Sequence, residues 1–340
     1  MKKTIRDVAA VAGVSPATVS RVLNKSGYVS KKAYDSVMKA IEKMDYSPNA
    51  MAVSLSKSRS RLIGIIVPSI YNEFFIDVVY AVEKKAESCG FRVLFCNTDY
   101  SVEKERAAIE DLISYKAVGL IIIPNRVREN NNVKLLNQLL KNETPVVCVD
   151  RELPGFAGDT IYIDNDSGLT ELVEAIVQKG HKRIAVLLDT KEDSPGSHIS
   201  KTDTDRIETV RKALHAHHLE LCEEYILRTS CADNSYHAAM KRFAEMPKRP
   251  TAVITLSSKA TVCAVCGFVS HGIKIPEDIF VAGYDDFHVL DAFRYSVQYS
   301  PVPVELGAVA AQTLFNRLEP EGNAFPSQHI TIPSRMSIEE

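Results

Sequence analysis

The stretch that decides the fold of the first part of the chain is Thr4-Ile-Arg-Asp-Val-Ala-Ala-Val-Ala-Gly-Val-Ser-Pro-Ala-Thr-Val-Ser-Arg-Val-Leu-Asn24. Its threonine, followed three positions later by Asp7, is a short form of the capping box and predicts a first helix. Ser15 before Pro16 predicts the start of a second helix, because proline at the first helical position loses no hydrogen bond. Two helices joined by a tight turn are typical of a helix-turn-helix motif.

A third helix is expected after Ser30, with Tyr34, Val37, Ile41 and Met44 at helical spacing on its apolar side. In such a motif the second helix enters the major groove of DNA with its amino-terminal residues against the base edges. This part of the sequence therefore predicts a compact DNA-binding headpiece.

The second helix divides into an inward and an outward face. Val19, Val22 and Leu23 are expected in the headpiece core, and Pro16, Ala17, Ser20 and Arg21 are expected to face DNA. The planar fork of Arg21 suits guanine O6 and N7, and such a contact is worth roughly 1–3 kcal/mol against a wrong base. Apolar contact is expected from Pro16 and Ala17, while the hydroxyls of Thr18 and Ser20 and nearby lysines suit phosphates.

Charge is distributed unevenly along the chain. Residues 1–61 carry eight lysines and four arginines against four acidic residues, a net charge of +8, and the remainder carries −10. A basic segment in front of an acidic body indicates that one end meets a polyanion, although a solvated basic helix pair would give the same count.

After residue 61 the pattern changes to alternating strands and helices. This order is typical of parallel sheets covered by helices. Because the strand-helix units are too many for one sheet, we expect two doubly wound lobes. The expected strands are Leu62–Val67, Phe91–Asn97, Gly119–Ile123, Val146–Asp150, Thr160–Ile163, Arg183–Leu188, Tyr225–Thr229, Ala252–Thr255 and Ile279–Ala282. Ligands in such folds bind beyond the carboxyl ends of the strands.

Bulk composition excludes several classes of protein. The chain has 340 residues with 45% apolar and 25% charged residues, which is ordinary for a globular protein. No apolar run approaches the ~20 residues that span a bilayer. Seven cysteines scattered through apolar stretches, without an export signal, are expected to be reduced thiols, and a cytoplasmic location is expected.

The headpiece motif resembles that of the lactose-repressor (LacI/GalR) family. The residues that carry it are Asp7-Val8-Ala9, Ala12-Gly13-Val14-Ser15, Thr18-Val19-Ser20-Arg21-Val22-Leu23-Asn24 and Tyr46-Ser-Pro-Asn49, and later Asp164-Asn165, Gly180-His181, Ile275-Pro276-Glu277-Asp278 and Gly283-Tyr284-Asp285-Asp286. The resemblance covers nearly the whole chain. It implies an all-α helix-turn-helix headpiece over 1–46, a hinge helix and linker over 47–61, and an α/β body over 62–340 with a two-lobed periplasmic-binding-protein-like fold of two doubly wound parallel sheets.

The resemblance further implies a homodimer on a pseudo-palindromic DNA operator. The segment at Asn49–Ser56 is expected to form a hinge helix only on the correct operator, with Leu55 wedged into a central CpG step. A linker leucine that rests on the body is the alternative for Leu55. The expected DNA contacts are Thr4, Ser15, Pro16, Ala17, Thr18, Ser20, Arg21, Asn24, Tyr28, Asn49, Ala52 and Leu55.

The resemblance also implies a small-molecule effector, a sugar, sugar acid or sugar phosphate, bound in the body. The expected effector contacts are Phe74, Phe75, Asp150, Arg206, Ser257, Ser258 and Asp285. Core packing at the start of a helix is the alternative for the two phenylalanines, and Arg151 is an alternative partner for Asp150. The chain is expected to cross between lobes near residues 162, 290 and 324, which gives lobe one as 62–162 plus 291–324 and lobe two as 163–290 plus 325–340.

Three departures from the family pattern concern the effector. Ser257-Ser258 stands where the family usually has Asn-Asp, Thr209-Val210 stands where it has Gly-aromatic, and the loop Lys191–Thr202 is longer than usual. Control by a protein co-regulator is therefore an alternative to control by a metabolite. A sugar-binding protein or enzyme with a vestigial headpiece is a third possibility.

Signals for catalysis are weak. Cys263-Ala-Val-Cys266 has redox spacing but lies within an expected apolar helix, and His215, His217 and His218 lack other metal ligands nearby. The chain has no Walker-type phosphate loop, no Gly-x-Ser-x-Gly elbow and no strand-linked dinucleotide motif. We therefore expect a regulator without a cofactor or metal, and not an enzyme.

Overall fold

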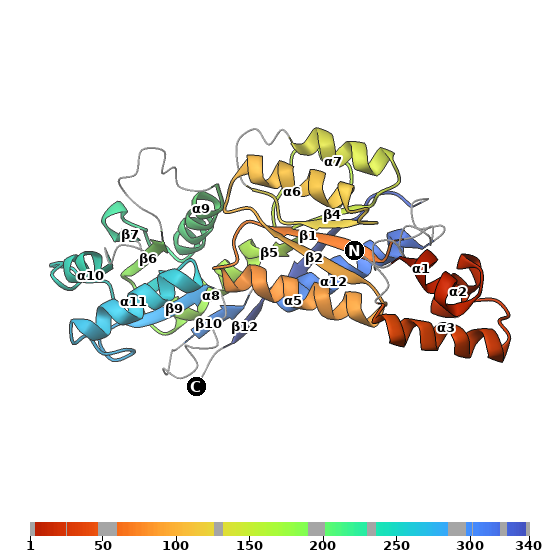
Figure 1. Ribbon diagram of the computed structural model, residues 1–340. Coiled ribbons are helices and arrows are strands. Elements are labelled where there is room, and N and C mark those ends of the chain that lie inside the picture. Colours follow the sequence, from red (N-terminus) through yellow and green to blue (C-terminus); the bar gives the residue numbers. More distant parts are fainter. Residues whose placement is uncertain are drawn as a thin grey trace. The chain divides into compact units, whose positions relative to one another are not determined.

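In the computed structural model the chain divides into two compact units, Met1–Arg61 and Leu62–Glu340, the headpiece and the body (Figure 1). The structure describes residues 4–24, 26–46, 60–125, 132–189, 201–229, 236–284, 297–300, 302–319 and 325–337. The expected hinge segment lies outside these residues, as do the expected contacts Asn49, Ala52, Leu55 and Asp285.

In its described residues the headpiece has three helices, α1 (Ile5–Ala12), α2 (Pro16–Asn24) and α3 (Lys31–Met44). Its core is small and contains the buried side chains of Val8, Ala9, Val19, Val22, Val37 and Ala40. Tyr34, which we expected on the apolar side of α3, is 42% exposed, because the buried stripe of this helix runs through Val37 and Ala40.

In its described residues the body contains two six-stranded sheets, one in each lobe. The first sheet has the order β11-β5-β4-β3-β1-β2 and the second has the order β12-β10-β9-β8-β6-β7. All neighbouring strands run parallel except β10 and β12. The strands are β1 (Leu62–Val67), β2 (Arg92–Asn97), β3 (Leu120–Ile122), β4 (Val146–Val149), β5 (Asp159–Asp164), β6 (Ile184–Asp189), β7 (Ile226–Thr229), β8 (Ala252–Thr255), β9 (Phe280–Tyr284), β10 (Val297–Ser300), β11 (His329–Pro333) and β12 (Arg335–Ser337).

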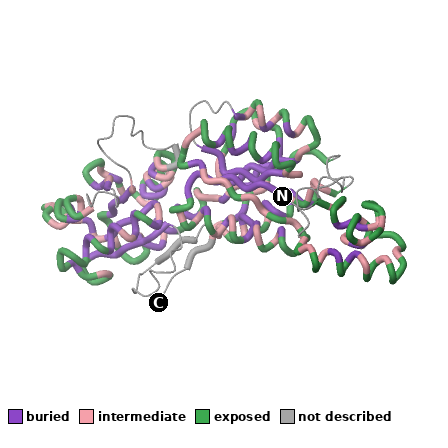
Figure 2. The backbone as a smooth tube through the Cα atoms, in the orientation of Figure 1, coloured by how far each residue is buried: buried purple, intermediate pink, exposed green. Residues whose placement is uncertain are grey.

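The central strands β1, β3 and β4 of lobe one are almost wholly buried (Figure 2). Helices α5 (Glu73–Ser88) and α12 (Pro303–Leu318) cover one face of the sheet, and α6 (Val102–Ser114) and α7 (Asn132–Lys141) cover the other. The alternation of the strands divides their side chains between these two cores. Gly307 permits the close approach of α12 to α5, since a Cβ there would lie 2.5 Å from the carbonyl oxygen of Val78.

Lobe two has one continuous core on its sheet. Its helices are α8 (Asn165–Gln178), α9 (Lys201–Ala216), α10 (Tyr236–Ala244) and α11 (Ser258–Ser270), and a short 3-10 helix, η1 (Glu223–Tyr225), precedes β7. Helix α8 packs with α9, and α10 packs with α11. The strand order around β6 repeats the order around β1, and the two sheets differ at their last strand, which is parallel in the first and antiparallel in the second.

The crossings between the lobes differ in part from the expected positions. The first lies where β5 ends and α8 begins, at Asp164 and Asn165, close to the expected residue 162. Strand β10 belongs to the second sheet and α12 covers the first, so the second crossing lies between residues 300 and 303 and not near 290. Strand β11 belongs to the first sheet and β12 to the second, so the third crossing is at Ser334 and not near 324. The sequence pattern missed β10, β11, β12, α7 and α12, and strand membership depends on partners distant in sequence.

Candidate nucleic-acid interface and effector site

The first helix of the headpiece is fixed by the capping box that the sequence predicts. The backbone nitrogen of Thr4 donates to Asp7 Oδ2 at 2.7 Å, and the backbone nitrogen of Asp7 donates to Thr4 Oγ1 at 3.4 Å. The backbone nitrogen of Thr4, together with its hydroxyl, which donates to the same carboxylate oxygen at 2.8 Å, holds the pKa of Asp7 below its usual value, because both bonds favour the ionised carboxylate. Gly13 closes the helix with φ 66°, a left-handed conformation that glycine adopts without strain.

The second helix begins as predicted. The backbone nitrogen of Thr18 donates to Ser15 Oγ at 3.2 Å, and the two side-chain hydroxyls lie 3.0 Å apart. Val19 and Val22 are buried, whereas Pro16 and Ala17 are exposed. Val19, Val22, Pro16 and Ala17 therefore have the predicted burial, whereas Leu23 and Ser20 are both partly buried.

Arg21 lies on the outward face of α2 and is exposed. Its side chain passes beside Gly27, where a Cβ would lie 3.7 Å from Arg21 Cδ. Tyr28, one residue further on, is 89% exposed. The turn after α2 thus leaves the guanidinium of Arg21 and the ring of Tyr28 accessible to a partner.

The remaining expected contacts of the headpiece have mixed exposure. Thr4 and Ser15 are exposed, and Thr18 and Ser20 are partly buried. Asn24 closes α2, and its side chain lies outside the described residues. Exposed basic side chains on the three helices are Arg6, Arg21, Lys31, Lys32, Lys39 and Lys43. Exposed basic side chains around a helix that enters a DNA groove are suited to contact the phosphates on either side of that groove.

In lobe one, a second arginine marks the carboxyl-end edge of the sheet. Arg151 follows β4 and donates from Nη1 to the carbonyl oxygen of Pro124, just after β3, at 3.0 Å. Its Nε lies 3.5 Å from Oδ2 of Asp150, and its guanidinium carbon lies 5.2 Å from the ring centroid of Phe75. The side chain is only 12% exposed. This guanidinium is therefore held in place before any ligand arrives.

The backbone at Asp150 is unusual for a residue with a side chain. Its φ is 66°, in the left-handed region, and its carboxylate is 14% exposed and paired with Arg151. Non-glycine residues that are held in the left-handed region cluster at active sites and ligand-binding sites. The alternative partner that the sequence left open for Asp150 is thus present.

The two phenylalanines at the start of α5 differ in burial. Phe75 is 2% exposed and belongs to the core of lobe one, and Phe74 is partly buried with its ring 5.6 Å from that of Phe75. Phe75 contributes to the edge through one ring face, beneath Arg151.

In lobe two the corresponding edge carries Arg206, on the first turns of α9. Its Nη1 donates to the carbonyl oxygen of Leu256, just after β8, at 2.7 Å. Its guanidinium carbon lies 4.2 Å from the ring centroid of Tyr284, the last residue of β9. The hydroxyl of Tyr284 donates in turn to the side-chain oxygen of Asn165.

The arginines of the two lobes make matching contacts from different elements, since Arg151 follows β4 and Arg206 lies on α9. Each binds a carbonyl oxygen at the carboxyl end of the third strand of its lobe and lies over an aromatic ring. In sheets of this order, the ends of the first and third strands form the crevice that receives ligands. Sequence reasoning named Arg151 only as a partner and Tyr284 only as part of a motif, because their contacts come from residues distant in the chain.

The two expected serine contacts begin α11. Ser257 caps this helix, since its Oγ accepts from the backbone nitrogen of Ala260 at 3.2 Å. Ser258 is 7% exposed. The pair lies beside Leu256 and hence beside Arg206, but the Ser257 oxygen already serves the backbone of its own helix.

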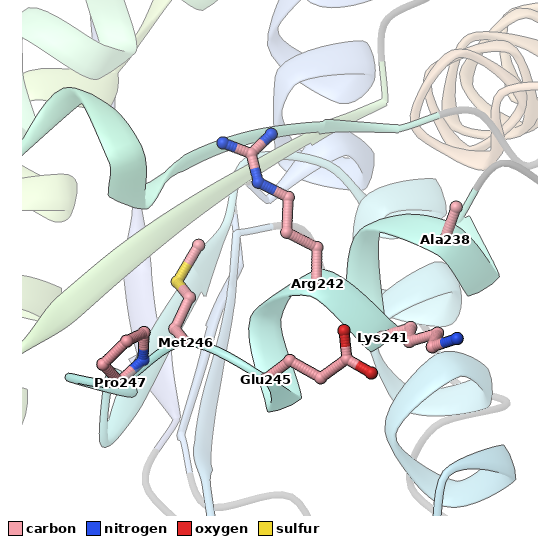
Figure 3. Close-up of a pocket in the computed structure, with 6 residues that line it drawn as sticks. All are labelled: Ala238, Lys241, Arg242, Glu245, Met246 and Pro247. Carbon is pink, nitrogen blue, oxygen red and sulfur yellow. The ribbon is translucent and has the colours of Figure 1, made fainter.

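A hollow on the surface of lobe two lies elsewhere. It is lined by Ala238, Lys241, Arg242, Glu245, Met246 and Pro247, on α10 and the turn that precedes β8 (Figure 3). This position is on the amino-end side of β8, away from the edge that carries Arg206, and none of the expected effector residues lines it.

The cysteines only partly follow expectation. Cys89, Cys96, Cys148, Cys222 and Cys266 are free thiols. Cys263 is disulfide-bonded, so the expectation of reduced thiols is wrong there. Because Cys266 is free, these two cysteines do not form a redox pair with each other.

The described part of the chain has neither a cluster of metal ligands nor a membrane-spanning helix. No group of three or more His, Cys, Asp or Glu side chains there is arranged to hold a metal ion. None of the helices in that part combines the length and the apolarity that crossing a membrane requires.

Comparison with known proteins agrees with both parts of the chain. Residues 4–49 match the family described as bacterial regulatory proteins, lacI family, and residues 173–338 match a periplasmic binding protein-like domain. The transcriptional repressor PurR of Vibrio campbellii is 30% identical over 85% of this chain and 84% of its own length. The transcriptional regulator KdgR of Bacillus subtilis is 28% identical over 94% of this chain and 93% of its own length.

The fold also matches a solved repressor. The lac repressor dimer bound to operator and an anti-inducer has a TM-score of 0.80 and 24% identity, over 100% of this chain and 98% of that one. The named relatives are regulators of transcription, which agrees with the expectation that this chain is not an enzyme. The chain therefore belongs to the lacI family of bacterial regulatory proteins, and it is a helix-turn-helix DNA-binding transcriptional regulator.

Proposed function

We propose that the chain is a cytoplasmic repressor that binds a pseudo-palindromic operator as a homodimer, and that a small carbohydrate or related metabolite sets its affinity for DNA. DNA binding is supported above all by the outward face of α2. Arg21 is exposed there, Tyr28 just after the helix is also exposed, and the opposite face of α2 packs into the headpiece core. The basic side chains around this face supply the electrostatic part of binding.

A homodimer is supported by apolar surface on lobe one. Strand β2 is an edge strand whose Phe95 is 40% exposed, and the neighbouring α5 exposes Tyr80 by 55% and Ile76 by 39%. An open strand edge next to exposed large apolar side chains is typical of a surface that associates with another chain. Two headpieces carried by two chains would match two half-sites of an operator.

A polyhydroxyl or anionic effector is supported by the two arginines at the carboxyl-end edges. Guanidinium groups bind carboxylates, phosphates and sugar hydroxyls through paired N–H donors. Arg151 and Arg206 are each fixed by a carbonyl oxygen and an aromatic ring, so little side-chain entropy is lost when a ligand binds. We include Arg151 among the effector contacts, together with Phe74, Phe75, Asp150, Arg206, Ser258 and Asp285.

The DNA part is tested by selection of bound duplexes from a random pool with the full chain, followed by titration of the selected duplex and a scrambled duplex. We expect a symmetric selected sequence, bound at least about a thousandfold more tightly than the scrambled one at the same salt concentration. Equal affinity for both duplexes would overturn the proposal.

The effector part is tested by titrating the complex with the selected duplex against glucose, cellobiose, gluconate and glucose 6-phosphate. At least one of these classes is expected to change the affinity for DNA, and Arg151→Met is expected to remove that response. If a protein co-regulator controls the chain instead, all four compounds leave DNA binding unchanged.

A further inference from the structure

The residue that begins α8 has an unusual place in the fold. Asn165 directly follows β5, at the first crossing between the lobes, and its side-chain oxygen accepts the hydroxyl hydrogen bond of Tyr284. Tyr284 is 0% exposed and ends β9 in lobe two. The tyrosine hydroxyl therefore joins the sheet of lobe two to the point where the chain leaves lobe one.

The same crossing is joined to the third crossing. The carbonyl oxygen of Asp164 accepts a hydrogen bond from Ser334 Oγ at 2.7 Å, and Ser334 separates β11 of lobe one from β12 of lobe two. Asp164 also caps α8 through Ser167, which donates from its backbone at 3.0 Å and from its hydroxyl at 2.6 Å. A few hydrogen bonds at Asp164 therefore join the first crossing to the third crossing and to the start of α8.

The face of the Tyr284 ring contacts an arginine of the proposed effector site. Arg206 lies over this ring at 4.2 Å, and one turn later on α9, Thr209 Oγ1 donates to Asp166 Oδ1 at 2.6 Å. Helix α9 is therefore linked to the first turn of α8 directly through Thr209 and indirectly through Tyr284 of β9.

We propose that Tyr284 is a positioning residue that couples the guanidinium of Arg206 to the crossing at Asn165, so that engagement of Arg206 by a ligand alters the junction between the lobes. The path runs from Arg206 through the aromatic face and the hydroxyl of Tyr284 to Asn165. That this path carries a signal from a bound ligand rests on the proposed function. The coupling between Arg206 and Asn165 is a property of the body alone.

Amide hydrogen exchange of the full chain, read by mass spectrometry without DNA or effector, tests this coupling. Tyr284→Phe removes one hydroxyl and keeps the ring. We expect exchange about fivefold faster in the peptides that cover residues 160–170 and 328–337, the loss expected from one net hydrogen bond. Unchanged exchange in both peptides would overturn the proposal.

A matched control is Tyr225→Phe. Tyr225 is also buried in lobe two, at 5% exposure, and its hydroxyl donates to the carbonyl oxygen of Lys248 at 2.6 Å, far along the chain from either crossing. This variant is expected to leave exchange in the two crossing peptides unchanged. If it accelerates them equally, the effect of Tyr284→Phe is a general loss of stability and the proposal is wrong.

Whether Arg206 acts on the crossing through Tyr284 is tested with Arg206→Met in two backgrounds. In the otherwise native chain it is expected to accelerate exchange at residues 160–170, and in the Tyr284→Phe background it is expected to add nothing there. An equal increment in both backgrounds would show that Arg206 acts by another route. Asn165→Ala offers the same comparison from the other end of the contact if Tyr284→Phe does not fold.

These outcomes are independent of the proposed function. A chain that prefers no duplex and responds to no sugar would refute the repressor proposal and leave the exchange result intact. A chain that binds DNA and responds to a sugar, but shows no exchange change in Tyr284→Phe, would refute only the coupling.

Discussion

Arg317 and Asp159 form a two-pronged buried ion pair in lobe one, with Nη2 2.7 Å from Oδ1 and Nε 2.9 Å from Oδ2. The side chains are 10% and 4% exposed. Arg317 also donates to the carbonyl oxygens of Phe325 and Pro326, so the pair fixes the end of α12, the start of β5 and the segment before β11. The hydrogen bond to Asp159 raises the pKa of Arg317, which stays charged.

Removal of one partner of this pair should destabilise the body. Arg317→Met leaves the Asp159 carboxylate buried without its cation, and the free energy of unfolding is expected to fall by about 3–5 kcal/mol in urea denaturation. The control is Arg106→Met, which breaks an exposed pair with Glu110 whose side chains are 53% and 55% exposed, and should cost less than about 1 kcal/mol. Similar costs for both variants would contradict the assigned role of the buried pair.

Base recognition should depend on Arg21. Arg21→Ala is expected to weaken binding of the full chain to its selected duplex by about 1–3 kcal/mol while binding to random duplex changes much less. Fluorescence anisotropy at one fixed salt concentration measures both. Arg106→Met, on the body, should alter neither affinity, and an equal loss on both duplexes would mean that Arg21 contacts phosphates and not bases.

The capping box should appear as a pH dependence of the headpiece. Because hydrogen bonds from Thr4 lower the pKa of Asp7, the ionised carboxylate stabilises α1 above the ordinary pKa of an aspartate, and this contribution is lost as the pH falls through the lowered value. Thr4→Ala removes the hydroxyl bond and keeps the backbone bond, so the pKa of Asp7, followed by NMR of its carboxyl carbon, should rise part of the way toward the ordinary value. Thr18→Ala should leave it in place, and an unchanged titration in Thr4→Ala would contradict the cap.

Thiol reactivity should follow burial. Burial raises the pKa of Cys148, and the nearby Glu105 and Asp150 carboxylates raise it further, so its thiolate is scarce. Cys89 and Cys266 are exposed. Iodoacetamide labelling read by mass spectrometry should modify Cys89 and Cys266 in the native chain and Cys148 only after unfolding, and early labelling of Cys148 would show that lobe one opens readily.

Local patterns were sufficient for the headpiece. The Thr4–Asp7 box, the glycine in left-handed conformation and the Ser15-Pro16 start act over three or four residues, so their structural consequences can be read from the sequence. The buried face of α2 followed from the spacing of Val19 and Val22. For Tyr34 the same reasoning failed, because the side of α3 that is covered depends on where the other two helices pack.

The sequence by itself determined the helix-turn-helix, the family and most of the alternating strands and helices up to β9, because propensity, capping and hydrophobic period are local properties. Only the tertiary structure decided which strand joins which sheet, and hence that the chain crosses at Ser334 and between residues 300 and 303. It also decided that Arg151 meets Pro124 and that Arg206, Tyr284 and Asn165 meet at a crossing. The physical reason is that neighbours in a parallel sheet are brought together by crossover connections, so contacts at the strand ends join residues far apart in sequence.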